Sequence, residues 1–138
     1  MSHHDIQAAL DTSVLMRLLT GEPAPQADKA RAWLAEIERD GAKVWIPNLV
    51  VSETYFACQH HYNIPKAEVL KGLHTLLSQP TFVVHPDLLE LLATKGLATA
   101  KPGFLDRLIH AEASTAGLTL VTFEKAAARL PRTHLLSD

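Results

Sequence analysis

The sequence has one cysteine, no long apolar run and no excess of positive charge. Cys58 stands alone among 138 residues, which excludes an internal disulfide and a metal site built from several thiolates. Such a chain fits a reducing, cytoplasmic setting. No apolar run approaches the ~20 residues of a membrane-spanning helix, and the N-terminus lacks the features of a signal peptide. We therefore expect a cytoplasmic protein with no membrane association, and we assign no function to the His3–His4 pair.

The net charge of −2, from 13 Lys and Arg against 15 Asp and Glu, argues against nucleic-acid binding through bulk positive charge. This balance changes if some acids hold metal ions, because neutralising four of them would move the net charge from −2 to +2. Residues 101–137 are locally basic and contain only three acids, which are Asp106, Glu112 and Glu124. A basic segment with a few special acids suits an anionic substrate.

Regular alternation of expected strands and helices organises the chain. The composition, 47% hydrophobic and 20% charged, is typical of a soluble globular protein, and the length suits a single domain over residues 1–138. Periodicity predicts strands at residues 6–10, 43–46, 81–85, 118–122 and 134–136. It predicts helices at residues 12–19, 27–39, 48–61, 66–78, 86–92, 104–116 and 124–130. This order predicts an α/β fold of three layers, with a central, mostly parallel sheet flanked by helices.

Asp11 lies between the first expected strand and the first expected helix. In open parallel sheets, ligands bind just outside the carboxyl ends of the strands. Thr12 or Ser13 is expected to cap the helix, whose free N–H groups would face the same spot. The sequence therefore places a carboxylate where such a fold builds its site. The alternative is that Asp11 is simply the N-cap of the helix.

Glu53 is the second informative acid. At 100° per residue, it falls within an apolar stripe of the expected helix 48–61. The other members of that stripe are Leu49, Val50, Phe56, Ala57 and His60. An unpaired charge in such a stripe is costly, so this carboxylate would need a cation, a proton or a metal. The alternative is that Glu53 lies at the edge of the stripe, paired with a Lys or Arg.

Asp106 and Glu124 are weaker signals of the same kind. Asp106 lies at the margin of an apolar arc, in the first turn of its expected helix, and His110 one turn later could pair with it. Glu124 closely follows the expected strand 118–122, again at a carboxyl end. The alternative for both is an ordinary first-turn acid that interacts favourably with the helix dipole.

Taken together, the four acids favour a hard cation with oxygen ligands, Mg²⁺ or Mn²⁺. Such an ion activates a water for in-line attack on phosphorus and offsets charge on the leaving oxygen. We expect Asp11, Glu53 and Asp106 to converge in one metal-binding cleft, with Glu124 outermost.

Four segments carry a resemblance to a known family: LDTSVL at 10–15, VVSETYF at 50–56, FLDRLIHAEA at 104–113 and LVTFEKAA at 120–127. In this order they resemble a PIN domain, and their spacing is most similar to that of the VapC toxins of bacterial VapBC toxin–antitoxin pairs. The resemblance implies a Mg²⁺- or Mn²⁺-dependent ribonuclease that acts on RNA, with tRNA as one option. It also implies a homodimer and neutralisation by a cognate antitoxin of the VapB type.

By position, the resemblance assigns Asp11, Glu53 and Asp106 to the core acids of the family. Glu124 stands where the family usually has Asp, so its role as a direct ligand stays open. Less specifically, the resemblance implies that Thr12, Ser13 or Thr122 help to hold water or phosphate. The helices around Trp33 and Tyr55 offer aromatic anchors for the antitoxin, although both residues suit a core equally well.

Other functions fit less well. A catalytically weak RNA-binding or regulatory module on the same fold is the main alternative, but RNA binding alone would not favour carboxylates beside phosphate. A phosphotransfer enzyme of the dehalogenase type would need a second Asp two residues after Asp11, where Ser13 stands. The chain has no GxSxG elbow for serine hydrolysis and no HExxH zinc motif.

Overall fold

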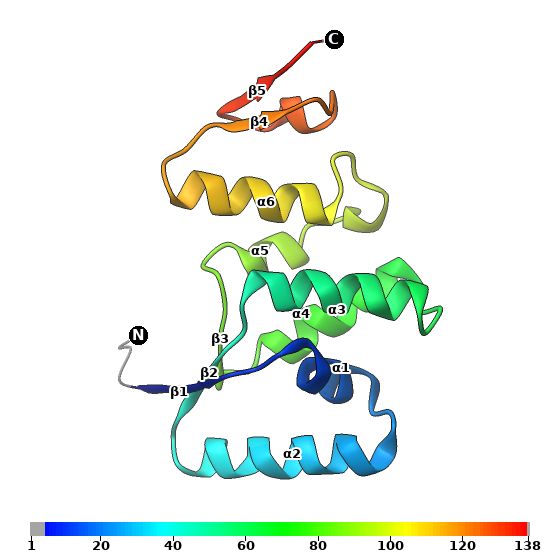
Figure 1. Cartoon of the computed structure of the whole chain (residues 1–138), viewed down its shortest axis with the longest axis vertical. Helices are drawn as coiled ribbons and strands as arrows, with labels where there is room; N and C mark the ends of the chain where they lie inside the picture. Colours follow the sequence, from blue (N-terminus) through cyan, green and yellow to red (C-terminus); the bar gives the residue numbers. More distant parts are fainter. Residues whose placement is uncertain (1–4, 138) are drawn as a thin grey trace. The chain divides into compact units, whose positions relative to one another are not determined.

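The computed structural model describes residues 5–137, so the His3–His4 pair lies outside the described residues (Figure 1). The chain folds as two compact units, Met1–Leu89 and Glu90–Asp138, called the first and second unit below. No helix among the described residues is long and apolar enough to cross a membrane.

The first unit alternates strands and helices as the sequence predicts. Its elements are β1 (Ile6–Ala9), α1 (Thr12–Thr20), α2 (Ala24–Arg39), β2 (Lys43–Trp45), α3 (Asn48–His60), α4 (Lys66–Leu77) and β3 (Phe82–Val83). Helix α2 begins three residues earlier than predicted, because a proline such as Pro25 is tolerated in a first helical turn. Strand β3 has two residues rather than the five of the predicted range 81–85.

The three strands of the first unit form a parallel sheet in the order β1-β2-β3. Ala9 pairs with Trp45 and Val44 pairs with Phe82, so both neighbours of the central strand run in its direction. Parallel strands need long crossover connections, which the helices between them provide. Val44 and Ile46, which point to the same face, are fully buried, and Trp45 between them, on the other face, is partly buried. The predicted α/β class with parallel strands is therefore confirmed.

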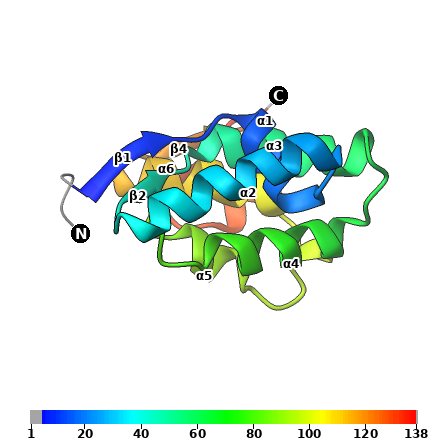
Figure 2. The same cartoon turned by 90° about the horizontal axis from the view of Figure 1, so that it is seen from below.

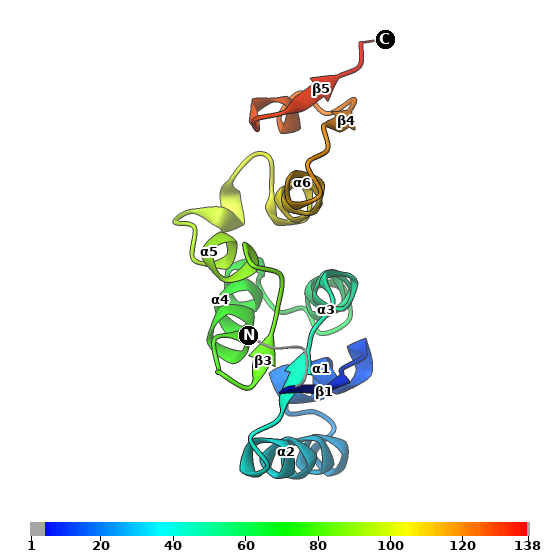
Figure 3. The same ribbon diagram turned by 90° about the vertical axis from the view of Figure 1, so that its left-hand side faces the viewer.

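Helix α1 is the centre of the first unit's packing. It packs against α2 and α3, as Figure 2 shows, and α3 in turn packs against α4 (Figure 3). Leu15 and Leu73 are fully buried in this core, and burying a leucine side chain stabilises a fold by about 1.5–3 kcal/mol. Cys58 Sγ lies 3.8 Å from Met16 Sδ, and burial raises the pKa of this thiol. Cys58 is therefore a protonated core residue.

The chain passes into the second unit within α5 (Leu88–Leu92), which begins two residues later than the predicted helix 86–92 and ends at the predicted residue. The second unit continues with the 3₁₀ helix η2 (Leu97–Thr99), α6 (Phe104–Thr115), β4 (Leu120–Thr122), the 3₁₀ helix η3 (Ala127–Arg129) and β5 (Thr133–Leu135). Strands β4 and β5 form a parallel pair of their own (Figure 3), so the five strands lie in two sheets of three and two.

Helix α6 supplies the apolar side of the second unit. Phe104, Leu108 and Ala111 are buried, at a helical spacing that places them on one face. The helix ends where the sequence predicts, because Gly117 adopts φ 74°, a left-handed conformation that other residues rarely take. The single-domain assignment of residues 1–138 stays a prediction.

Candidate functional site

Asp11 lies directly after β1, at the carboxyl end of the first parallel sheet. Its Oδ1 accepts a hydrogen bond from Val14 N at 3.1 Å and another from Ser13 Oγ at 2.6 Å. Its backbone is extended, with φ −91° and ψ 178°, and the residue is the N-cap of α1. The prediction that Thr12 or Ser13 caps this helix is wrong. The helix begins at Thr12 as predicted, but its cap is Asp11, because this carboxylate accepts from the N–H of Val14, the third helical residue.

These two hydrogen bonds lower the pKa of Asp11. The Ser13 hydroxyl has the largest effect and the Val14 N–H the next, while slight desolvation acts weakly in the opposite direction. Both donors stabilise the charged form of the carboxylate. Asp11 is also exposed, so at neutral pH it is an ionised oxygen ligand that solvent and ions can reach.

Glu53 is linked to this end of α1 by one hydrogen bond. Thr12 Oγ1 donates to Glu53 Oε1 at 2.9 Å, which joins α1 to α3 across 41 residues of sequence. Thr12 directly follows Asp11 in the sequence, so this bond brings Glu53 to the end of α1 at which Asp11 lies. No local pattern could have shown this bond, because the two partners are remote in the sequence.

The prediction that Glu53 lies within a buried apolar stripe is wrong. Glu53 is exposed, and the neighbours assigned to its stripe include Leu49 and Phe56, which are 70% and 53% exposed. The core of the first unit takes the opposite side of α3, where Val51, Thr54, Tyr55 and Cys58 are buried. Helix α3 carries apolar residues around its whole circumference, so periodicity alone did not define which side faces the core.

A shallow hollow of about 390 Å³ opens beside Glu53. Thr12, Phe56 and His61 contribute to its walls. The ring of Phe56 lies 4.2 Å from that of His60, measured between centroids. Glu53 therefore faces an open, solvent-accessible hollow with one aromatic wall.

Asp106 and Glu124 belong to the second unit. Asp106 is exposed in the first turn of α6, as predicted. Its suggested partner, His110, instead places Nε2 2.7 Å from the carbonyl oxygen of Pro131. Because a carbonyl only accepts, His110 Nε2 donates this bond and ties α6 to the segment before β5.

Glu124 follows β4 at its carboxyl end, but it lies in a turn. The predicted helix 124–130 is replaced by the 3₁₀ helix η3, which begins at Ala127. The Glu124 N–H donates to Thr122 Oγ1 at 2.9 Å, so this hydroxyl shapes the turn after the strand. The Glu124 carboxylate is exposed.

Among residues 5–137, no group of three or more His, Cys, Asp or Glu side chains is arranged to hold a metal ion. The first unit brings together two acids, Asp11 and Glu53, through the Thr12 hydrogen bond. The convergence of these two with Asp106 stays a prediction. Asp11 and Glu53 offer carboxylate oxygens, and the side chains that hydrogen-bond to them, Ser13 and Thr12, offer hydroxyl oxygens, a donor set that suits Mg²⁺ or Mn²⁺.

Comparison with known proteins agrees with the resemblance drawn from the four sequence segments. Residues 8–133 match the sequence model of the PIN domain family, a range that includes all four acids. A VapC ribonuclease from Aquifex aeolicus (strain VF5) is 26% identical over 109 residues. The aligned region covers 79% of this chain and 80% of that protein.

Proposed function

The chain belongs to the PIN domain family, and from this premise we propose that it is a Mg²⁺- or Mn²⁺-dependent endoribonuclease, the toxin of a type II toxin–antitoxin pair. The observation that carries the proposal is the arrangement at the start of α1. The ionised carboxylate of Asp11 accepts a hydrogen bond from the Ser13 hydroxyl. The residue next to Asp11, Thr12, donates a hydrogen bond to the carboxylate of Glu53. The similarity to a VapC ribonuclease over most of both chains supports the same activity.

The metal-binding residues in this proposal are Asp11, Glu53 and Asp106, with Glu124 outermost. Asp11 and Glu53 fit a divalent ion because both are exposed carboxylates whose orientation a neighbouring hydroxyl fixes. Magnesium ions commonly bind through a few carboxylates and keep several waters. A bound divalent ion supplies Lewis-acid chemistry, since it lowers the pKa of water and offsets negative charge at phosphorus.

The chain's own groups prepare the site for a phosphodiester. The Ser13 and Thr12 hydroxyls hold the two carboxylates in fixed orientations, which reduces the entropy lost when a ligand binds. Helix α1 also begins beside Asp11, and a helix N-terminus favours anions such as phosphate. A water nucleophile, rather than the 2′-hydroxyl of the RNA, would leave a 5′-phosphate and a 3′-hydroxyl.

The proposed partners follow from the family. We propose RNA as substrate, tRNA included, a VapB-type antitoxin as inhibitor, a homodimer as the working form and the cytoplasm as the location. Tyr55 is buried at 6% exposure, so of the two suggested aromatic anchors only the half-buried Trp33 remains available at a surface. Light scattering tests the dimer, and a monomer at high concentration would contradict it.

The direct test is RNA cleavage by the purified protein with Mg²⁺, with Mn²⁺ and with a chelator. We expect cleavage only with a divalent ion, loss of cleavage in Asp11→Asn and normal cleavage in Asp40→Asn, an exposed acid after α2. Product ends are then identified by labelling. RNA binding without cleavage under every condition, or a 2′,3′-cyclic phosphate product, would contradict the proposed mechanism.

A further inference from the structure

A second hollow, of about 540 Å³, lies within the first unit between α1 and α2. Its volume is within the range of about 300–1,000 Å³ that small-ligand sites occupy. The side chains that matter for its chemistry are Leu10, Ser13, Val14, Arg17, Lys29 and Trp33. Of these residues, Ser13 also holds Asp11, and Trp33 is the aromatic anchor suggested for the antitoxin.

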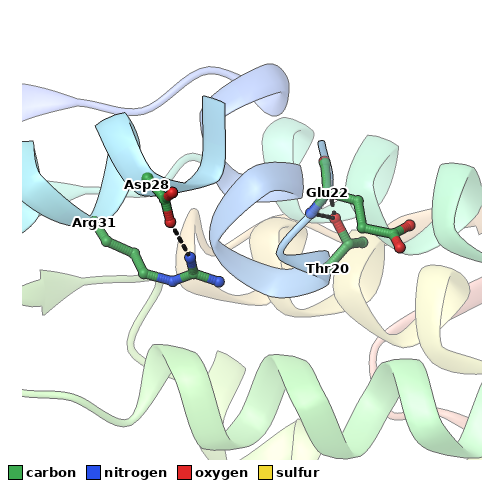
Figure 4. Close-up of polar contacts among 4 residues, drawn as sticks. All are labelled: Thr20, Glu22, Asp28 and Arg31. Atoms are coloured by element: carbon green, nitrogen blue, oxygen red, sulfur yellow. Dashed lines mark hydrogen bonds and ion pairs between the residues drawn. The ribbon is translucent and has the colours of Figure 1, made fainter. Parts of the chain in front are cut away.

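The hollow carries two cations and no acid. Arg17 Nε donates to Gln26 Oε1 at 2.6 Å, a contact that fixes the guanidinium at the wall. Asp28, the acid next to Lys29 in the sequence, instead pairs with Arg31 at 3.2 Å (Figure 4). Among the described residues, neither Arg17 nor Lys29 is in an ion pair. Because the lining contains two cations and no acid, the hollow favours an anionic occupant.

Trp33 gives the hollow an aromatic wall. Lys29 and Trp33 are four residues apart on α2, so they lie on one face of that helix. The indole is half-buried and shares the lining with apolar Val14 and Leu10. A partly exposed indole can stack against a flat ring of a ligand, and the two cations beside it can bind a negatively charged group of the same ligand.

The two helices that wall the hollow are joined by a short turn with defined hydrogen bonds. Gly21 adopts φ 73°, and Glu22 N donates to Thr20 Oγ1 at 3.2 Å, which closes a tight turn (Figure 4). The positive φ of Gly21 is one that other residues rarely adopt, so glycine suits this turn. The hollow is therefore a preformed feature of the first unit.

Ser13 places the hollow beside the candidate metal-binding acids. Its side chain lines the hollow, and its hydroxyl donates to Asp11 Oδ1 at 2.6 Å. A strand of RNA with one phosphodiester at Asp11 would have neighbouring nucleotides within reach of this hollow. An acidic peptide would also match the charge of Arg17 and Lys29. It would not account for the position of these two cations beside both the Trp33 ring and the candidate metal-binding residue Asp11.

We propose that this hollow is a nucleotide subsite: one nucleotide of an RNA strand stacks its base on Trp33, and Arg17 and Lys29 bind its phosphate. The proposal rests on the proposed function, because it takes RNA as the substrate, and it adds where the strand next to the scissile bond binds. Base stacking on an aromatic side chain tolerates any base, so the subsite contributes affinity and direction rather than sequence specificity.

The test is binding of a fluorescently labelled single-stranded RNA pentanucleotide, followed by anisotropy in the presence of a chelator so that no cleavage occurs. We expect Trp33→Ala to weaken binding about tenfold and Trp33→Phe to restore most of the loss. Lys29→Ala should reduce the slope of log affinity against log salt by about 0.7, the value for one phosphate contact on a single strand. The matched control is Lys71→Ala, an exposed lysine on α4, which should behave as the wild type.

A second readout follows Trp33 directly. In a Trp45→Phe background, Trp33 is the only tryptophan, and the RNA should quench its fluorescence. Wild-type binding by both Trp33→Ala and Lys29→Ala, in a protein that still cleaves RNA, would overturn the subsite and leave the ribonuclease standing. Quenching of Trp33 without any RNA cleavage would support the subsite and overturn the ribonuclease. Quenching by an acidic peptide but not by RNA would overturn the subsite in favour of a protein partner.

Discussion

The acids of the two units differ in how their side chains are held. In the first unit, Asp11 accepts from Ser13 and Val14, and Glu53 accepts from Thr12. In the second unit, no described residue donates to the side chain of Asp106 or of Glu124. The bonds at Glu124 are made by its backbone, whose N–H donates to Thr122 Oγ1 and whose carbonyl accepts from Ala128 N. The first pair is therefore oriented before any ligand binds, whereas the second pair keeps its rotamer freedom. A ligand that binds Asp106 or Glu124 would order that side chain at an entropic cost.

The largest expected effect is the loss of cleavage in Asp11→Asn, which we expect to exceed the 10–100-fold typical of changes to groups that only support a metal ligand. Asn caps a helix about as well as Asp, so this variant should keep the stability of the wild type. Asp11→Ala should lose both activity and about 1 kcal/mol of stability, because it also removes the cap. RNA cleavage and urea unfolding of both variants separate the two roles. Normal cleavage by a well-folded Asp11→Asn would leave Asp11 as an N-cap only.

Thr12→Val tests the hydrogen bond that orients Glu53. The substitution keeps the shape of the side chain and removes the donor to Glu53 Oε1. We expect cleavage to fall about 10–100-fold, the range for residues that orient a ligand. Urea unfolding should change little, since the bond is exposed to solvent. The control is Thr75→Val on α4, and equal activity of the two variants would show that this orientation is unimportant.

Glu124→Ala tests whether Glu124, an acid of the second unit whose carboxylate no described residue orients, contributes to the metal site. We expect a higher Mg²⁺ requirement or slower turnover, again within about 10–100-fold, but a smaller loss than in Asp11→Ala. Glutamate has one more methylene than the Asp usual at this position, so fixing it as a direct ligand costs more rotamer entropy, and it acts more readily through a metal-held water. Mg²⁺ titration of cleavage measures the difference. Complete inactivity at saturating Mg²⁺ would make Glu124 a core acid, and wild-type behaviour would remove it from the site.

The sequence predicted the order of elements and the position of Asp11 because these depend on local signals. An apolar run, an acid and a helical pattern occur together within residues 6–19, and β1, Asp11 and α1 lie there as predicted. Glu53 shows the limit of periodicity. Its helix is apolar all round, and tertiary packing chose the side with Val51 and Tyr55 as the core. The Thr12–Glu53 bond and the hollow at Trp33 depend on how separate elements pack, which no local pattern encodes.

The smallest expected effect concerns Ser13, the main cause of the lowered pKa of Asp11. An acid whose pKa is lower in the folded state stabilises the fold above its unfolded pKa, about 3.9 for Asp, and this contribution is lost as the pH falls through the folded value. Ser13→Ala removes the hydroxyl donor, so the pKa of Asp11 should rise toward its ordinary value. The wild type should therefore be more stable than Ser13→Ala at neutral pH, and the difference should shrink below about pH 4.

Two measurements check this prediction about Ser13. Carbon-detected NMR titration of the Asp11 carboxyl group reports its pKa in each protein, and urea unfolding from pH 7 to pH 3 reports the free energy of unfolding. Ser78→Ala is the matched control, because the hydroxyl of Ser78 bonds a backbone carbonyl at the end of α4 and no carboxylate. A stability difference that persists unchanged at pH 3 would mean that Ser13 stabilises α1 independently of the charge on Asp11. In that case the orientation of Glu53 would depend on the Thr12 hydroxyl, and that of Asp11 on the N–H of Val14 alone.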